Sequence, residues 1–253
     1  MKFRVSKTQK KLIYLITGIV LNILSVLGSL LLPSSASKFS FAPFNFLWEF
    51  FTINWCVWNS VLTVIYNLNE LKNERQKNKV ISERQKNFGL IVAVSNLIAI
   101  LVFTSILFKP TLLPKNRDAF WWTNALIWHY IAPLIALNYY FQFAKIKKSD
   151  FQKKSLFWIV LPMPVIFFLA NLTRRFLAQP EYLGEKLKTL KFKKFLIPWF
   201  KWAEEGKFAL LACLIAFSIL SFWFTGWLLL KIKKNYFTKS KTKKLTSQKF
   251  QQN

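Results

Sequence analysis

Apolar residues gather along the chain in windows of about twenty, separated by short polar segments that are rich in lysine. A helix of about 20 residues, rising about 1.5 Å per residue, crosses the ~30 Å hydrocarbon core of a bilayer. The pattern predicts six transmembrane helices, over residues 12–32, 45–66, 88–108, 120–143, 155–172 and 208–230. We therefore expect an all-α, polytopic membrane protein, with one transmembrane domain over 12–230 and no soluble domain.

The segments between and beyond these helices are polar and basic. A basic N-terminal segment, 1–11, precedes the first helix, and the basic tail over 231–253 is predicted to be disordered. Residues 67–87 are predicted to form a charged loop. The fifth helix contains Pro162 and Pro164, and each proline removes a backbone donor, so we expect a kink there.

Lysine and arginine are distributed unequally over the two sides of this topology. The N-terminal segment, the loops after the second and fourth helices, and the tail hold 24 of the 37 basic residues, and the other three loops hold 13. Because cytoplasmic segments carry the excess of positive charge, both termini are predicted to be cytoplasmic. The expected location is the cell membrane, which the chain crosses several times.

The net charge of +27 changes the expected partners rather than the fold class. The basic residues flank apolar helices and match no nucleic-acid-binding motif, which argues against a nucleic-acid partner. Juxtamembrane cations are attracted to anionic lipid head groups by about 1 kcal/mol each. Membrane lipids are therefore the expected partners.

The sequence predicts no cofactor and no metal site. Cys56 and Cys213 lie in separate apolar helices, which gives neither a disulfide framework nor the spacing of metal ligands. The chain has one histidine, too few for a usual zinc site, and it has no phosphate-binding glycine loop, G-x-S-x-G elbow or H-E-x-x-H motif.

Polar side chains form a stripe in the second predicted helix. Their spacings are 3, 4, 3 and 4 residues, which places them on one helical face: Glu49, Thr52, Cys56, Asn59 and Thr63. A polar stripe on a membrane helix avoids lipid by facing other helices. We expect this face to point into the bundle.

The single histidine, His129, lies in the fourth helix, one turn before Pro133. Both helices are entered from the outer side, so Thr52 and His129 are predicted at depths of about 9 and 13 Å, within one layer. An ionisable side chain at membrane depth usually faces a partner or a cavity.

Three interpretations of this layer stay open. In the first, the Thr52 hydroxyl hydrogen-bonds to a backbone carbonyl of its own helix, and His129 forms a polar contact between helices. In a second interpretation, His129 is the general base that activates Thr52, with Glu49 or Asn59 orienting the imidazole or binding the oxyanion. In a third, His129 and Glu49 belong to a path for protons or substrate.

Short motifs in the chain resemble a known family. Phe51-Thr52 with Asn59, His129 followed by Pro133, and the segment over 197–200 (IPWF) are similar to motifs of the six-helix androgen-induced gene 1 and androgen-dependent TFPI-regulating proteins, including bacterial Pr6Pr-like members. The animal members hydrolyse fatty-acid esters of hydroxy fatty acids. The resemblance implies a lipid-ester hydrolase with Thr52 and His129 as its catalytic residues.

The alternative is a membrane protein without enzymatic activity. Six helices with little mass outside the membrane suit a small-solute uptake component that works with an energising partner, or a lipid-binding subunit. A stand-alone transporter is disfavoured because the sequence shows no internal repeat and no paired glycine-broken helices.

Overall fold

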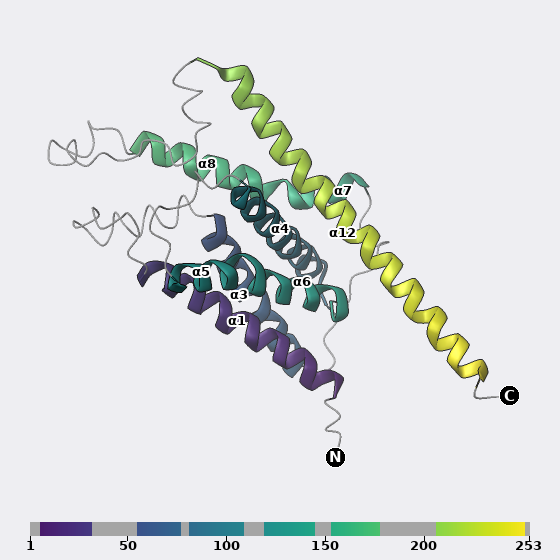
Figure 1. Cartoon of the computed structure of the whole chain (residues 1–253). Helices are drawn as coiled ribbons and strands as arrows, with labels where there is room; N and C mark the ends of the chain where they lie inside the picture. The colour runs from purple at the N-terminus through teal and green to yellow at the C-terminus, as the bar shows by residue number, and fades with distance from the viewer. Residues whose placement is uncertain are drawn as a thin grey trace.

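The computed structural model describes residues 6–31, 55–76, 81–108, 119–144, 153–177 and 206–250 (Figure 1). Its elements are α1 (Lys7–Leu31), α3 (Trp55–Arg75), α4 (Glu83–Leu107), α5 (Ala119–Leu126), the π-helix η3 (Ile127–Ile131), α6 (Ala132–Gln142), α7 (Lys153–Val160), α8 (Pro162–Leu177) and α12 (Phe208–Phe250). The predicted all-α class is confirmed for these ranges, which contain no strand.

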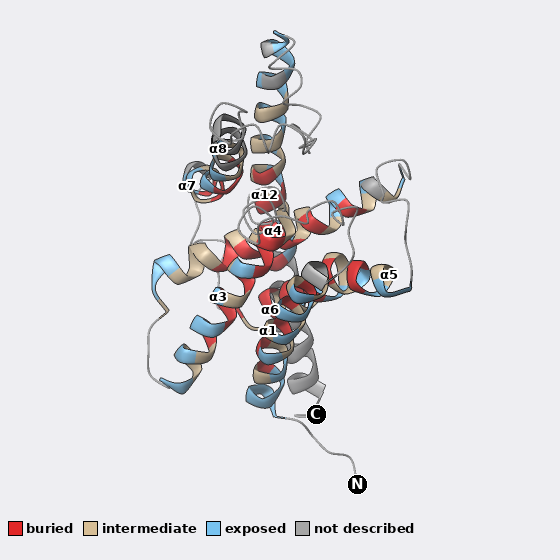
Figure 2. Cartoon of the chain, turned by 90° about the vertical axis from the view of Figure 1, so that its left-hand side faces the viewer, coloured by how far each residue is buried: buried red, intermediate tan, exposed pale blue. Residues whose placement is uncertain are grey.

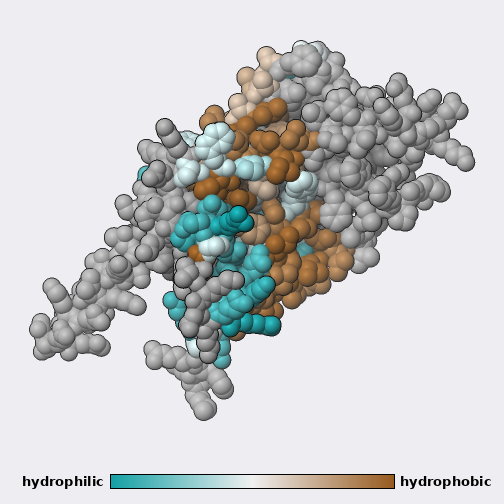
Figure 3. Space-filling model, turned by 180° about the vertical axis from the view of Figure 1, so that it is seen from behind, coloured by the Kyte–Doolittle hydropathy of each residue, from teal (hydrophilic) through white to brown (hydrophobic). Residues whose placement is uncertain are grey.

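Three helical segments among the described residues are long and apolar enough to cross a membrane. They are Lys7–Gly28, Glu83–Ser105 and Ala212–Lys233, and Ser155–Leu169 forms a shorter apolar helix. Large apolar side chains of α1 are exposed at intervals of three and four residues, as at Ile13, Ile16 and Val20. Figure 3 shows apolar side chains spread over a broad face, with hydrophilic ones gathered beside them. These features indicate a membrane protein.

Helix α4, which corresponds to the predicted third helix, lies at the centre of the bundle. It packs against α3, α6, α7 and α12, and Figure 2 shows its buried residues along much of its length. The largest core cluster joins α4 to α6, α7 and α12 through Leu90, Val94, Tyr140, Val160 and Leu229. Helix α1 covers α3 and α6 on the other side.

The predicted fourth helix is formed by three consecutive elements, α5, η3 and α6. The backbone N–H of Ala132 donates to the carbonyl of Ile127, five residues earlier. Pro133 follows directly; it has no N–H, and its ring crowds the carbonyl of residue 129. A wider π turn relieves this conflict, and it lies where the histidine is found.

Two segments differ from the sequence prediction. Residues 67–75, expected in a charged loop, continue α3 to Arg75, because Asn67 and Glu70 are buried against neighbouring helices. The tail, expected to be disordered from residue 231, is described as part of α12 as far as Phe250. No glycine or proline occurs after Gly226 to end that helix.

The kink expected at Pro162 and Pro164 corresponds to a break between two helices. Helix α7 ends at Val160, and α8 starts at Pro162.

Candidate functional site

His129 lies in η3 and faces α3 and α4. Its ring stacks on Phe103 of α4, with centroids 3.9 Å apart and an interplanar angle of 9°. Its Nδ1 atom is 3.1 Å from Sγ of Cys56 on α3, which is hydrogen-bond distance for a thiol. The stacking fixes the ring plane, so the imidazole presents Nδ1 to the polar face of α3.

Further along the same face of α3, buried polar side chains form a closed chain of hydrogen bonds with α4. Asn59 Nδ2 donates to Oδ1 of Asn96 at 3.0 Å, and Asn96 Nδ2 donates to Oγ1 of Thr63 at 3.0 Å. Thr63 in turn donates to the carbonyl of Asn59 at 2.7 Å. The prediction that this stripe points into the bundle is confirmed for Cys56, Asn59 and Thr63.

The structure brings together only part of the predicted site. Glu49 and Thr52 lie outside the described residues, so their position relative to His129 stays a prediction. Asn59 is buried on the expected face, but its amide donates to Asn96 rather than to the imidazole. The described partner of His129 is Cys56, a member of the predicted polar stripe for which the sequence indicated no catalytic role.

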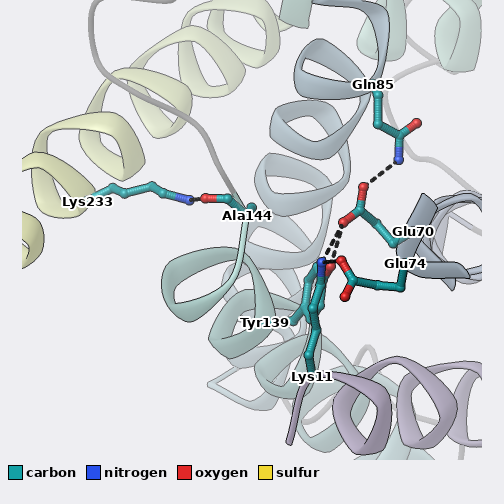
Figure 4. A network of polar contacts seen from close by, with 7 residues as sticks. All are labelled: Lys11, Glu70, Glu74, Gln85, Tyr139, Ala144 and Lys233. Atoms are coloured by element: carbon teal, nitrogen blue, oxygen red, sulfur yellow. Dashed lines mark hydrogen bonds and ion pairs between the residues drawn. The ribbon is translucent and has the colours of Figure 1, made fainter. Parts of the chain in front are cut away.

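A second group of polar residues, missed by the sequence analysis, is centred on Glu70. Tyr139 donates to its Oε2 atom at 2.5 Å, and Gln85 donates to its Oε1 atom at 3.0 Å. Lys11 lies 3.6 Å from Oε2 and also forms an ion pair with Glu74. Figure 4 shows these side chains converging from α1, α3, α4 and α6, so one ionic network joins four helices.

The signal for this network was present in the sequence. After Thr63 the stripe continues at Asn67, Glu70 and Glu74, with spacings of 4, 3 and 4 residues. Asn67 and Glu70 are buried. The density of charge after residue 67 favours a loop over a helix, and it masks the helical spacing of these residues.

Lys233 of α12 is buried, and it forms hydrogen bonds with the backbone at the end of α6. Its Nζ atom donates to the carbonyl of Ala144 at 2.8 Å (Figure 4). It also donates to the carbonyl of Tyr140 at 2.5 Å and lies 3.9 Å from the centroid of the Tyr140 ring. Tyr140 lies in the last turn of α6 and Ala144 two residues beyond its end, where unpaired carbonyls and the helix dipole favour a cation. Lysine therefore caps α6 from a neighbouring helix.

Within the described part of the chain, no group of three His, Cys, Asp or Glu side chains is arranged to hold a metal ion. No family model matches the sequence, and neither a curated protein nor a solved structure is significantly similar to it. The resemblance to the six-helix family therefore stays a prediction.

Proposed function

We propose that this chain is a multi-pass protein of the cell membrane, related to the six-helix family, that hydrolyses lipid esters inside the bilayer. The proposal includes six membrane-spanning segments with both termini in the cytoplasm. Three apolar helices of spanning length support it. The start of α1 and the end of α12 also lie towards the same end of the molecule (Figure 1).

The observation that carries the enzymatic proposal is the contact between His129 and the polar face of α3. Nδ1 of His129 is 3.1 Å from Cys56 Sγ, so the imidazole is within reach of a nucleophile on that face. The resemblance assigns the nucleophile to Thr52, which precedes Cys56 by four residues in the sequence. Glu49 and Asn59 remain supporting candidates on the same stripe.

The proposed chemistry is acyl transfer followed by hydrolysis. The nucleophile gives its proton to His129 and attacks the ester carbonyl, and the imidazolium then protonates the departing alcohol. Water releases the fatty acid and restores the nucleophile. The apolar helices around the site suit a substrate that enters from the lipid phase rather than from water.

The test is ester turnover by the purified full chain in detergent micelles. A general base contributes about 10²–10⁴ to the rate, so His129→Ala is expected to lose at least ~100-fold of the turnover of a long-chain acyl ester. The matched control is Tyr130→Phe, which removes the hydroxyl that contacts Thr104 but leaves the neighbouring histidine in place. Full activity in His129→Ala would falsify the proposal.

A second candidate function is supported by the length of the polar face of α3. Inward-facing polar residues follow one another from Cys56 to Glu74, about 27 Å along the helix. Buried ionisable groups in membrane helices often mark a path for protons or polar solutes. A solute uptake component with an energising partner would use such a path. Absence of ester turnover, together with solute or proton flux that Glu70→Gln abolishes, would favour this candidate.

A further inference from the structure

We infer that Cys56 is the nucleophile of this site and that it carries the acyl group as a thioester. The ligand class is the long-chain acyl group of a membrane lipid ester. The inference rests on the proposed function, because it needs His129 to serve as the base of an acyl-transfer site. It moves the nucleophilic role from Thr52 to a residue that the structure places against the imidazole.

The geometry is that of a thiol and imidazole pair. Cys56 and His129 come from helices far apart in sequence, and their Sγ and Nδ1 atoms are 3.1 Å apart. When Nδ1 is unprotonated, the thiol donates to it, which is the arrangement that lets a base remove the thiol proton during attack. Phe103 and Trp128 stack on the imidazole, with centroids 3.9 and 5.6 Å away, and limit its rotation.

Nearby hydroxyl groups form their hydrogen bonds with groups other than His129. Ser60 accepts a hydrogen bond from Trp128 Nε1 at 2.8 Å, and Thr63 donates to a backbone carbonyl of its own helix. Thr104 donates to the carbonyl of Ile100 and contacts Tyr130. Among the thiol and hydroxyl side chains of the described ranges, that of Cys56 is the one within hydrogen-bond distance of His129.

A second observation suggests that this face binds a ligand. The Oδ1 atom of Asn59 is buried and has no hydrogen-bond partner within the described ranges. Asn59 lies one turn beyond Cys56 on the same side of α3. A buried acceptor without a donor is costly, so a hydroxyl or amide group of a bound lipid would stabilise it. Cys56 itself is only half-buried.

The covalent step balances without a redox partner. The Cys56 proton passes to Nδ1 of His129 as the bond between sulfur and the acyl carbon forms. The bond from that carbon to the ester oxygen breaks, and the departing alkoxide takes the proton from the imidazolium. Water then attacks the thioester carbonyl while His129 accepts its proton, and the bond from carbon to sulfur breaks. The imidazolium returns that proton to sulfur, which leaves the carboxylic acid and the Cys56 thiol. Thiols are the more reactive nucleophiles near neutral pH, which favours sulfur over a hydroxyl oxygen.

The experiment is to trap the acyl intermediate on the full chain in detergent micelles. The probe is a long-chain nitrophenyl ester with a terminal alkyne, followed by a short quench and detection of the alkyne. We expect labelling that neutral hydroxylamine removes, because hydroxylamine cleaves thioesters and leaves oxygen esters intact. Cys56→Ala should lose this label, and His129→Ala should slow its formation at least ~100-fold. Cys213→Ser is the matched control, because Cys213 is an exposed thiol on α12, and it should label normally.

A Cys56→Ser variant is a second test of the same role, in case the Cys56→Ala variant does not fold. If Cys56 is the nucleophile, the serine variant should carry a slower label that resists hydroxylamine. A resistant label in the wild type that disappears in Thr52→Ala overturns the role of Cys56 and leaves the hydrolase proposal intact. A label on Cys56 that forms equally fast in His129→Ala is simple chemical acylation and also overturns it. A folded protein that forms no acyl intermediate and has no turnover contradicts both proposals.

Discussion

The carboxylate of Glu70 is buried in the bundle, yet each of its two oxygen atoms has a donor. Tyr139 donates to one and Gln85 to the other, while Lys11 lies between this carboxylate and that of Glu74. A buried ion pair adds little over a well-packed apolar pair, but removing one member leaves an uncompensated charge. We expect the network to fix how four helices meet more than it raises the net stability.

Replacing Glu70 by glutamine keeps the shape of the side chain and removes the charge that faces Lys11. We expect Glu70→Gln to lower the free energy of unfolding by about 1–3 kcal/mol, measured by thermal unfolding in detergent. The control is Glu83→Gln, since that side chain is 69% exposed and pairs with Lys86 in the first turn of α4. An exposed pair contributes less than about 1 kcal/mol, so the control should change little. Equal losses would contradict the role given to Glu70.

A candidate site residue could be recognised from the sequence where the residues around it are all apolar. His129 was recognisable because it is the single histidine and interrupts an apolar window. Glu70 was harder to recognise, because the charged residues around it favour a loop, although the spacing of the polar stripe continues to it. The contact of Cys56 with His129 depends on how α3 packs against η3, which no spacing within either helix determines.

At the scale of the elements, the π-helix η3 sets the direction of His129. Pro133 cannot donate to the carbonyl of His129, and the wider turn absorbs one extra residue before α6 begins. In a regular α-helix each residue turns the chain by about 100°, so removing the π turn rotates α5 and η3 against α6. The position of the imidazole therefore depends on this proline.

A cross-linking experiment checks this dependence. In a His129→Cys variant with Cys213→Ser, we expect a short bifunctional thiol reagent to join positions 56 and 129. Adding Pro133→Ala restores the backbone donor and allows a regular helix, so the yield should fall several-fold. Pro162→Ala, at the first residue of α8, is the control and should leave the yield unchanged. If the cross-linking yield is the same with and without Pro133→Ala, side-chain packing alone positions residue 129.

The apolar windows predicted helices α1, α4 and α12, and the joined elements α5, η3 and α6, within a few residues at most ends. They failed at the end of α3 and in the tail, where the prediction equated charge with irregular structure. Helical hydrogen bonding continues through charged residues when no glycine or proline ends it. The π turn itself could not be predicted, although Pro133 marked its place.

Over the described part of the molecule, large apolar side chains are exposed on the outer helices, and a set of polar side chains is buried between the helices. Figure 2 shows the inward positions of α3, α4 and α6 as buried, whereas exposed leucine, isoleucine and phenylalanine side chains cover α1 and α12. An apolar outer surface, with polar side chains kept inside beside the apolar core, is the arrangement expected where lipid replaces water. It supports the proposed topology.

Single cysteines introduced into a Cys56→Ala, Cys213→Ser background test that topology in intact cells. Ser6→Cys, before α1, and Ser247→Cys, near the end of α12, should react with an impermeant maleimide only after the membrane is permeabilised. Phe108→Cys, at the outer end predicted for α4, should react without permeabilisation, since this side chain is 85% exposed. The opposite pattern would reverse the proposed orientation.

The polar face of α3 also bears on how the chain is made. Seven residues of this helix are buried, and six of them carry hydroxyl, amide or carboxyl groups. Such a segment partitions poorly into lipid by itself, because each unpaired polar group is costly there. Helix α1 is apolar and precedes it, and it packs along α3 in the finished structure. We therefore expect the insertion machinery to release α3 into the bilayer together with partner helices, and the early steps of biogenesis to be cooperative rather than helix by helix.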